Sequence, residues 1–136
     1  MNQKGLNLKE LIIFTALLLL IIVLGILLLR SERARVRDSR RIADMNRLRY
    51  GFEVLFNEEN SYAQAAEGCD QENSLVSTCN LTQYLPSISS IKDPGKYSYQ
   101  VKSVPDKENY VIKFTLEKDY KGLAAGQHIL DANGIH

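Results

Sequence analysis

Few residues in this chain could do chemistry, and the first of them is Glu10. It stands directly before an uninterrupted apolar run, residues 11–29, with Lys9 beside it. A carboxylate at the edge of a membrane segment is costly unless an opposite charge neutralises it. Glu10 is therefore either a counter-charge for an amine or, with Lys9, a simple marker of a membrane interface.

The two cysteines, Cys69 and Cys79, lie ten positions apart and are the only ones in the chain. They could be buried free thiols, a metal pair or a disulfide. With no third ligand near them, the spacing favours a disulfide if this part of the chain lies outside the cytoplasm. Closing that loop would contribute about 3 kcal/mol of stability.

The remaining polar residues give weak indications of a site. We expect His128 and His136 to be a strand residue and a terminal residue rather than metal ligands. Asp119, Asp131 and Asn133 carry oxygen atoms of the kind that calcium prefers, but their spacing matches no calcium-binding loop. The sequence has no glycine-rich phosphate loop, nucleophile elbow or paired catalytic carboxylates, so we expect neither an enzyme nor a bound metal or cofactor.

The apolar run is the strongest feature of the composition. As a helix its 19 residues would be about 28 Å long, close to the hydrocarbon thickness of a bilayer. Sixteen of them are Leu, Ile, Val or Phe, which favour insertion by about 5 to 10 kcal/mol, against about 3 kcal/mol for one carboxylate at the edge. A cleaved secretory signal would be shorter and followed by small residues, whereas this run ends in RSERARVR. The sequence predicts a retained single membrane helix.

Charge is distributed unevenly, although the net charge is only +1. Residues 30–49, the basic neck, hold eight Arg against three carboxylates, a net of +5, whereas residues 50–136 hold seven Lys against twelve carboxylates, a net of −5. The neck lacks the pattern of a nucleic-acid-binding segment, because its charges are mixed in sign and no aromatic residue interleaves with them before Tyr50. Nucleic acid is not an expected partner, although a role in DNA uptake stays open.

One long helix is expected to carry these features. No proline occurs between Leu6 and Asn60, and the sequence predicts a helix of about 55 residues, roughly 80 Å long. Its second half has an apolar face formed by Ile42, Met45, Leu48, Phe52, Leu55 and Phe56. Charged residues are expected largely off that face, namely Arg40, Arg41, Arg47, Arg49 and Glu53.

The rest of the chain should cover that face. Residues 64–94 read as an irregular loop, with one short helical turn around residues 81–85. After the turn signature Asp93-Pro94-Gly95, residues 96–104 and 109–117 alternate as two strands of a hairpin, and residues 126–136 offer a third strand with a tight turn at Asn133-Gly134. The expected fold class is α+β, a long helix on an antiparallel sheet of three or four strands in an undetermined order.

The start of the chain resembles the class III leader of type IV prepilins and of the related type II secretion pseudopilins. In that family a short basic leader ends in glycine, and the fifth mature residue is a glutamate inside an apolar helix. Here the leader would be MNQKG with basic Lys4, cleaved after Gly5, so that Leu6 becomes the N-methylated terminus and Glu10 the fifth mature residue. The helix through residue 62 resembles that of bacterial pilins and major pseudopilins, whereas the resemblance over the remainder is loose.

The resemblance implies a structural subunit that a prepilin peptidase processes and that polymerises through its helix into a type IV pilus or pilus-like filament, a helical homo-oligomer. The parts would be the leader (1–5), a stem (6–29) that spans the membrane and later forms the filament core, an amphipathic half (30–60) and a head (61–136). The head would contain the disulfide loop 69–79 and a sheet at about 96–135. Other implied partners are membrane lipid before assembly and an inner-membrane assembly platform with its ATPase.

The residues also give a physical reason for Glu10. Cleavage after Gly5 would leave an amine on Leu6, which is unfavourable against the helix dipole, and Glu10 of a neighbouring copy would neutralise it. Two positions depart from the family pattern. Leu6 replaces the usual Phe, and Leu27 replaces a frequent proline, which leaves a kink near Gly25 open.

Membrane orientation has two readings. Eight Arg follow the apolar run, against Lys4 and Lys9 before it, and this excess predicts a cytoplasmic head. The alternative function is then a single-pass membrane-anchored binding module with a cytoplasmic head that docks on acidic lipids. The leader and the cysteine pair instead favour a head outside the cytoplasm, carried on a pilus or on a periplasmic pseudopilus.

Overall fold

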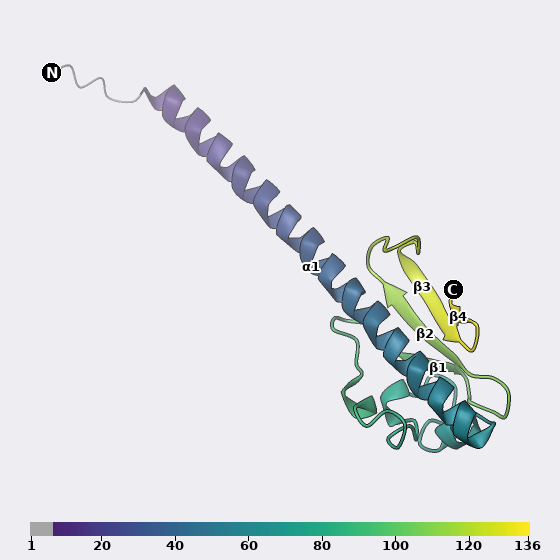
Figure 1. The fold of residues 1–136 in the computed structure, drawn as a ribbon. Helices are drawn as coiled ribbons and strands as arrows, with labels where there is room; N and C mark the ends of the chain where they lie inside the picture. The colour runs from purple at the N-terminus through teal and green to yellow at the C-terminus, as the bar shows by residue number, and fades with distance from the viewer. Residues whose placement is uncertain (1–6) are drawn as a thin grey trace. The chain divides into compact units, whose positions relative to one another are not determined.

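The computed structural model describes residues 7–136. It contains a long helix, α1 (Leu8–Glu59), short 3-10 helices η1 (Ala63–Ala66), η2 (Val76–Thr78) and η3 (Ile88–Ser90), and strands β1 (Gln100–Ser103), β2 (Val111–Leu116), β3 (Gly126–Asp131) and β4 (Gly134–Ile135) (Figure 1). The chain divides into two compact units, one ending at Ala34 and one running from Arg35 to His136. Helix α1 contributes to both.

In the first unit, α1 is apolar on all sides. Residues 11–29 are exposed except for the half-exposed Gly25, and the helix continues through that glycine without interruption. The hydroxyl of Thr15 donates to the carbonyl oxygens of Leu11 (3.0 Å) and Ile12 (2.9 Å), so it is satisfied inside the helix. By length and composition this helix is able to cross a membrane, as the sequence predicts.

In the second unit, one face of α1 is buried at alternating steps of three and four residues, which is the helical period. The fully buried side chains on this face are those of Asp38, Arg41, Met45, Leu48, Phe52 and Leu55. Ile42 and Phe56, also predicted for this face, are half-buried at its edge. Asn60 ends the helix in the left-handed conformation (φ 52°), and its N–H donates to the carbonyl oxygen of Phe56 at 2.8 Å.

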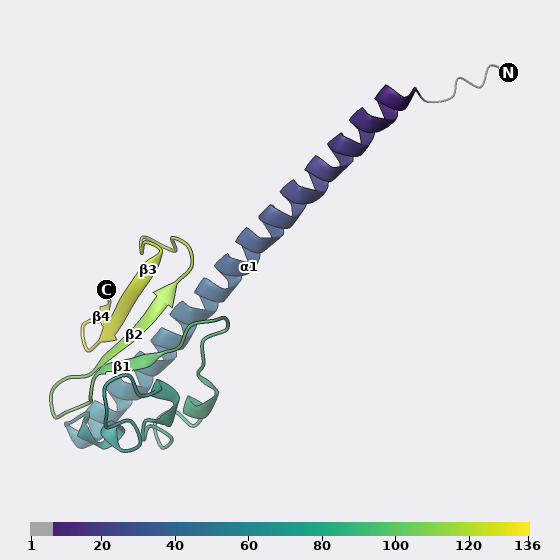
Figure 2. The same ribbon diagram turned by 180° about the vertical axis from the view of Figure 1, so that it is seen from behind.

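The sheet is an antiparallel meander in the order β1-β2-β3-β4. Alternate residues of β2 are buried, and they belong to the same apolar core as the buried face of α1. Phe52 of α1 stacks on Tyr110, just before β2, with ring centroids 3.8 Å apart. The expected α+β fold class, a long helix packed on a small antiparallel sheet, is confirmed (Figure 2).

The segment between α1 and β1 completes this core. It bonds along one edge of the first predicted strand, where the backbone N–H of Val76 donates to Tyr99 and that of Val101 donates to Ser74. On its other edge this strand pairs with β2 over Gln100–Ser103, which is shorter than the alternation predicts. The expected turn near residue 81 is present as a hydrogen bond from the N–H of Leu85 to the carbonyl oxygen of Leu81 (2.6 Å).

Candidate functional site

Glu10 lies in the first turn of α1 and has a local partner. Helix α1 begins at Leu8, which makes Asn7 the capping residue, and the backbone N–H of Asn7 donates to Oε2 of Glu10 at 3.1 Å. A glutamate three positions after the cap that reaches back in this way is half of a capping box. The spacing of Asn7 and Glu10 was the signal in the sequence for this second role of Glu10 as a capping residue.

The remaining predicted residues of this end, Gly5 and Leu6, lie outside the described residues. The structure also shows how much of the apolar helix after Glu10 is covered by the rest of the chain. None of the most apolar 18-residue window of α1 is buried within the described chain. Such a surface is stable only in lipid or against other apolar side chains.

The second unit contains a buried ionic cluster centred on Arg41. Its side chain is fully buried, and its Nε and Nη2 donate to both carboxylate oxygens of Asp93 at 2.6 and 2.9 Å. Its Nη1 donates to Asp38 (2.7 Å) and to Glu117 (2.8 Å). One guanidinium thus joins α1 to the loop before β1 and to the end of β2.

The carboxylates of the cluster are held in turn by backbone groups and by a second arginine. Asp38 accepts the backbone N–H groups of Glu117 and Lys118, each at 2.9 Å. Glu117 also accepts two hydrogen bonds from Arg37, at 2.7 and 2.6 Å. Among the described residues no buried side-chain nitrogen or oxygen lacks a hydrogen-bond partner. Because every buried polar atom of the cluster has a hydrogen-bond partner, the cluster is suited to fixing the helix to the sheet and not to catalysis.

The prediction that Arg41 lies off the buried face is wrong. Position 41 is four residues before Met45 and three after Asp38, so it continues the same stripe. A close backbone approach helps to accommodate it, since a β-carbon on Gly95 would come within 2.9 Å of Nη2 of Arg41. The helical period was the available signal, but the sequence could not show that carboxylates from distant segments would neutralise the charge.

The charges of the cluster stabilise one another. Burial disfavours the Arg41 cation, but hydrogen bonds to Asp93, Glu117 and Asp38 outweigh it and raise the pKa of Arg41. Hydrogen bonds from Arg37, against the effect of burial, lower the pKa of Glu117 to about 2. For Asp93, burial is likewise outweighed by its bonds to Arg41 and to the N–H of Gly95, and the net pKa is lowered.

Acid should therefore weaken the second unit. Because the pKa of Glu117 falls from 4.5 to about 2 on folding, its contribution is complete above pH 4.5 and is lost as the pH falls towards 2. Asp44 acts in the opposite sense, since burial raises its pKa. We expect the urea midpoint of the full chain in detergent to drop across this window, and the drop to be smaller in Glu117→Gln. An equal pH slope in both proteins would contradict the assignment.

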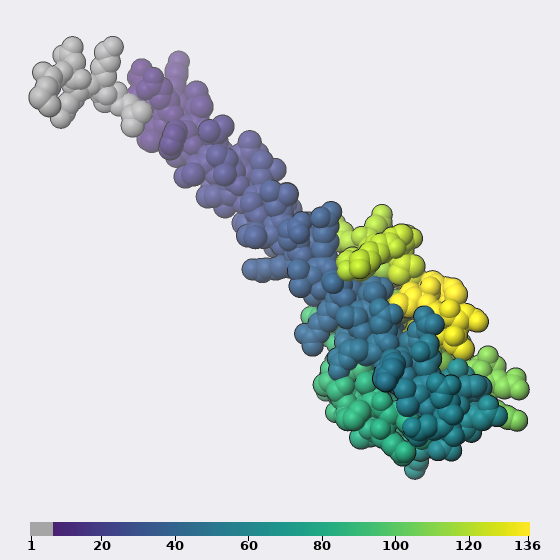
Figure 3. Space-filling view, viewed as in Figure 1, coloured from purple at the N-terminus to yellow at the C-terminus, as the bar shows by residue number. Residues whose placement is uncertain are grey.

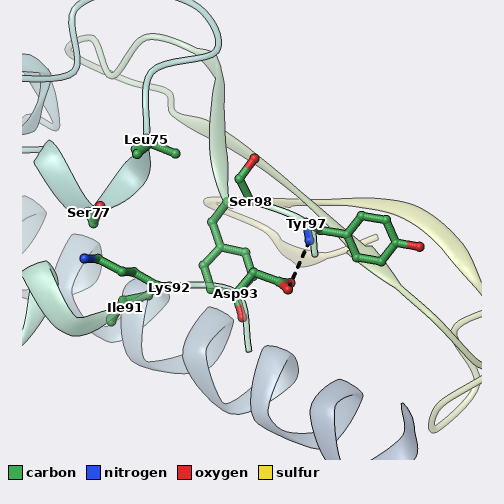
Figure 4. Close-up of a pocket in the computed structure, with 8 residues that line it drawn as sticks. Leu75, Ser77, Ile91, Lys92, Asp93, Tyr97 and Ser98 are labelled. Atoms are coloured by element: carbon green, nitrogen blue, oxygen red, sulfur yellow. Dashed lines mark hydrogen bonds between the residues drawn. The ribbon is translucent and has the colours of Figure 1, made fainter. Parts of the chain in front are cut away.

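A pocket of about 190 Å³ opens beside the cluster. Figure 4 shows Asp93 at this pocket, bonded to the backbone N–H of Tyr97. The wall is largely apolar, and its lining residues are Leu75, Ser77, Ile91, Lys92, Asp93, Tyr97, Ser98 and Tyr99. Asp93 is already engaged by Arg41 and Tyr99 donates to Asp44, so neither of these two side chains is free to act as an acid or a base, and Lys92 of the wall is exposed.

The aspartates considered as calcium ligands accept hydrogen bonds from backbone N–H groups in turns. Asp119 accepts the backbone N–H of Ala125 at 2.8 Å, and Asp131 accepts those of Asn133 and Gly134 in the turn between β3 and β4. No group of three or more His, Cys, Asp or Glu within residues 7–136 is placed to hold a metal ion. Asp119 and Asp131 thus each accept backbone N–H groups in a turn of their own.

The two histidines lie in the middle of β3 and directly after β4. His128 belongs to β3, as the sequence predicts, and Nδ1 of its ring lies 3.0 Å from the carbonyl oxygen of the terminal His136. Nε2 lies 2.7 Å from the carbonyl oxygen of Ala124. Both ring nitrogens thus face backbone carbonyl groups, and the ring connects β3 to the residue after β4 and to the segment before β3.

Cys69 and Cys79 form the predicted disulfide, and both are buried. It closes a loop that also depends on a close backbone contact at Gly68. This glycine has a φ of 88°, and a β-carbon on it would meet the carbonyl oxygen of Thr78 at 2.3 Å.

Comparison of the chain with protein-family models, with curated proteins and with solved structures finds no match.

Proposed function

We propose that this protein is a pilin-like structural subunit, which loses residues 1–5 to a prepilin peptidase and polymerises through its stem into a type IV pilus or a related filament. One observation carries the proposal. A single carboxylate, Glu10, begins an apolar helix whose side chains lie uncovered within the described chain, and the same helix continues into a folded α+β head.

The uncovered stem needs an environment before and after assembly. In the bilayer its Leu and Ile side chains contact lipid, and by composition the helix spans the hydrocarbon region. In a filament the stems of neighbouring copies would cover one another in place of lipid. Helices that are apolar all round belong either in membranes or in large apolar cores, and a bundle of stems provides the second.

Glu10 gives the assembly its register. The amine on Leu6 that processing creates would meet the carboxylate of a neighbouring copy, and two buried charges would then form one pair. The capping bond to Asn7 does not prevent this, since a carboxylate accepts several hydrogen bonds at once.

The disulfide supports a head outside the cytoplasm, because such bonds form and persist in oxidising compartments. The assembly platform, its ATPase and the peptidase would be the partners on the membrane side. Adhesion, motility, DNA uptake and secretion all use this kind of subunit, and the proposal extends to each of them. The excess of arginine after the stem favours the rival cytoplasmic module, so orientation belongs in the test.

Processing is the first test. The protein isolated from membranes or filaments should start at Leu6 and lack MNQKG, with a methyl group on the new amine. Intact-mass measurement reads both changes, and negative-stain imaging of cells with and without the chain shows whether filaments depend on it. Met1 on the protein in membranes, together with a head that proteases cannot reach on intact cells, would favour the cytoplasmic module instead.

A further inference from the structure

In the second unit, the face of α1 opposite the buried stripe is uncovered. Val36, Ala43 and Tyr50 follow one another at seven-residue spacing on this face, and all three are exposed, Val36 by 69% and Tyr50 by 63%. We call these three residues the neck seam. In Figure 3 this part of α1, in blue to teal, lies open between the yellow strands and the green loop segment.

Arginines flank the seam and keep much of their charge free for a partner. Arg40 is exposed and forms no salt bridge or side-chain hydrogen bond among the described residues. Arg47 donates to the hydroxyl of Ser87 (2.6 Å) and lies 3.6 Å from Asp44, yet 48% of its side chain is exposed. Apolar and aromatic side chains bordered by arginines are typical of protein–protein contact surfaces.

The opposite charge gathers in the last turns of α1 and in the segment that follows the helix. From Tyr50 to Ile91 the chain has no Lys or Arg, whereas residues 53–72, the acidic end, hold Glu53, Glu58, Glu59, Glu67, Asp70 and Glu72. Within the described residues, the side chains of Asp70 and Glu72 make no ion pair or hydrogen bond and are exposed. The Cys69–Cys79 disulfide fixes the loop that carries them.

We propose, on the basis of the filament assigned above, that the neck seam of one copy docks against the acidic end of a second copy. The two copies are then parallel and displaced along the helix axis. Side by side without displacement, arginines would face arginines and carboxylates would face carboxylates, which disfavours that arrangement. From Arg47 to Glu58 the helix rises about 16 Å, so the displacement is at least of this order.

Charge reversal on each side tests the contact in the full chain. Arg40→Glu with Arg47→Glu should lower sheared-filament yield at least tenfold, and so should Asp70→Lys with Glu72→Lys. The four substitutions combined should restore most of the yield, because the pairs are re-formed with reversed sign. Arg40→Lys with Arg47→Lys keeps the charge and should stay close to the unchanged protein. Reversal of Lys96 and Lys107, two exposed lysines that belong neither to the neck seam nor to residues 53–72, is the matched control.

A photo-crosslinker identifies the neighbour directly. Benzoylphenylalanine in place of Tyr50, irradiated in filaments and in membranes, should capture a peptide from residues 53–72 of a second copy. Unchanged yield in both reversed variants, failure of the combined variant to recover, or capture of a different segment would overturn the docking. If the unchanged protein forms no filaments and no crosslink between copies, the proposed function fails with it, whereas filaments that ignore the reversals leave that function standing.

Discussion

Glu10→Gln is expected to remove most filament assembly while leaving membrane insertion and processing intact. Insertion depends on the 16 strongly apolar residues of the stem, and cleavage depends on Gly5, which is unchanged. What is lost is the charge that faces the amine of a neighbouring Leu6. Removing one partner of a buried pair costs about 3 to 5 kcal/mol, which corresponds to a loss of more than about 100-fold in the contact equilibrium.

The capping bond makes this substitution informative. Gln is as suitable as Glu at this position of a capping box, so Glu10→Gln keeps the hydrogen bond from Asn7 and removes only the charge. Glu10→Ala removes both. If the charge matters, the two variants fail alike in sheared-filament yield relative to total membrane protein; if only the cap matters, the Gln variant assembles normally.

The control for Glu10 must come from an exposed carboxylate. Glu108→Gln is suitable, because Glu108 is exposed and belongs neither to the neck seam nor to the acidic end. Asp38, also in the second unit, is unsuitable because it is fully buried in the ionic cluster. Filament yield from Glu10→Gln equal to that of Glu108→Gln would return Glu10 to the role of an ordinary interface residue.

Arg41→Met is expected to destabilise the second unit by about 3 to 5 kcal/mol, because it strips the cation from buried carboxylates. Asp38 would keep its two backbone N–H donors but would lose the cation that Arg41 supplies at 2.7 Å. A folded domain is stable by about 5 to 15 kcal/mol, so this single change should remove a large fraction of the total. Urea unfolding of the full chain in detergent, followed by near-ultraviolet circular dichroism, measures it.

The neighbouring arginine provides the matched control. Arg40→Met makes the same chemical change one residue earlier, at an exposed position, and should alter stability by no more than about 0.5 kcal/mol. Equal losses from the two variants would mean that Arg41 contributes no more than an exposed arginine does. A large loss from Arg41→Met alone would assign the cluster the task of holding α1 on the sheet.

The sequence by itself determined the elements whose signals are local. Nineteen consecutive apolar residues indicate a helix able to span a bilayer, and the three-and-four spacing from Met45 to Leu55 indicates a buried helical face. Alternation after Pro94 indicates antiparallel strands. Two cysteines with no competing ligand indicate the disulfide. Each of these follows from a repeat or a spacing within a short window, where backbone geometry dictates which side chains share a face.

Only the tertiary structure decided which charged side chains are buried and which partners neutralise them. Arg41 reads as a surface residue until Asp93 and Glu117, 52 and 76 positions away, are brought against it. No local pattern encodes such pairing, because the cost of burying an arginine is offset only by partners that the fold itself delivers. The same holds for the first predicted strand, where Tyr99 and Val101 bond to the loop at Val76 and Ser74. A pattern of side chains shows which face is buried, whereas the hydrogen-bonding partner of each backbone group depends on which segment lies beside it.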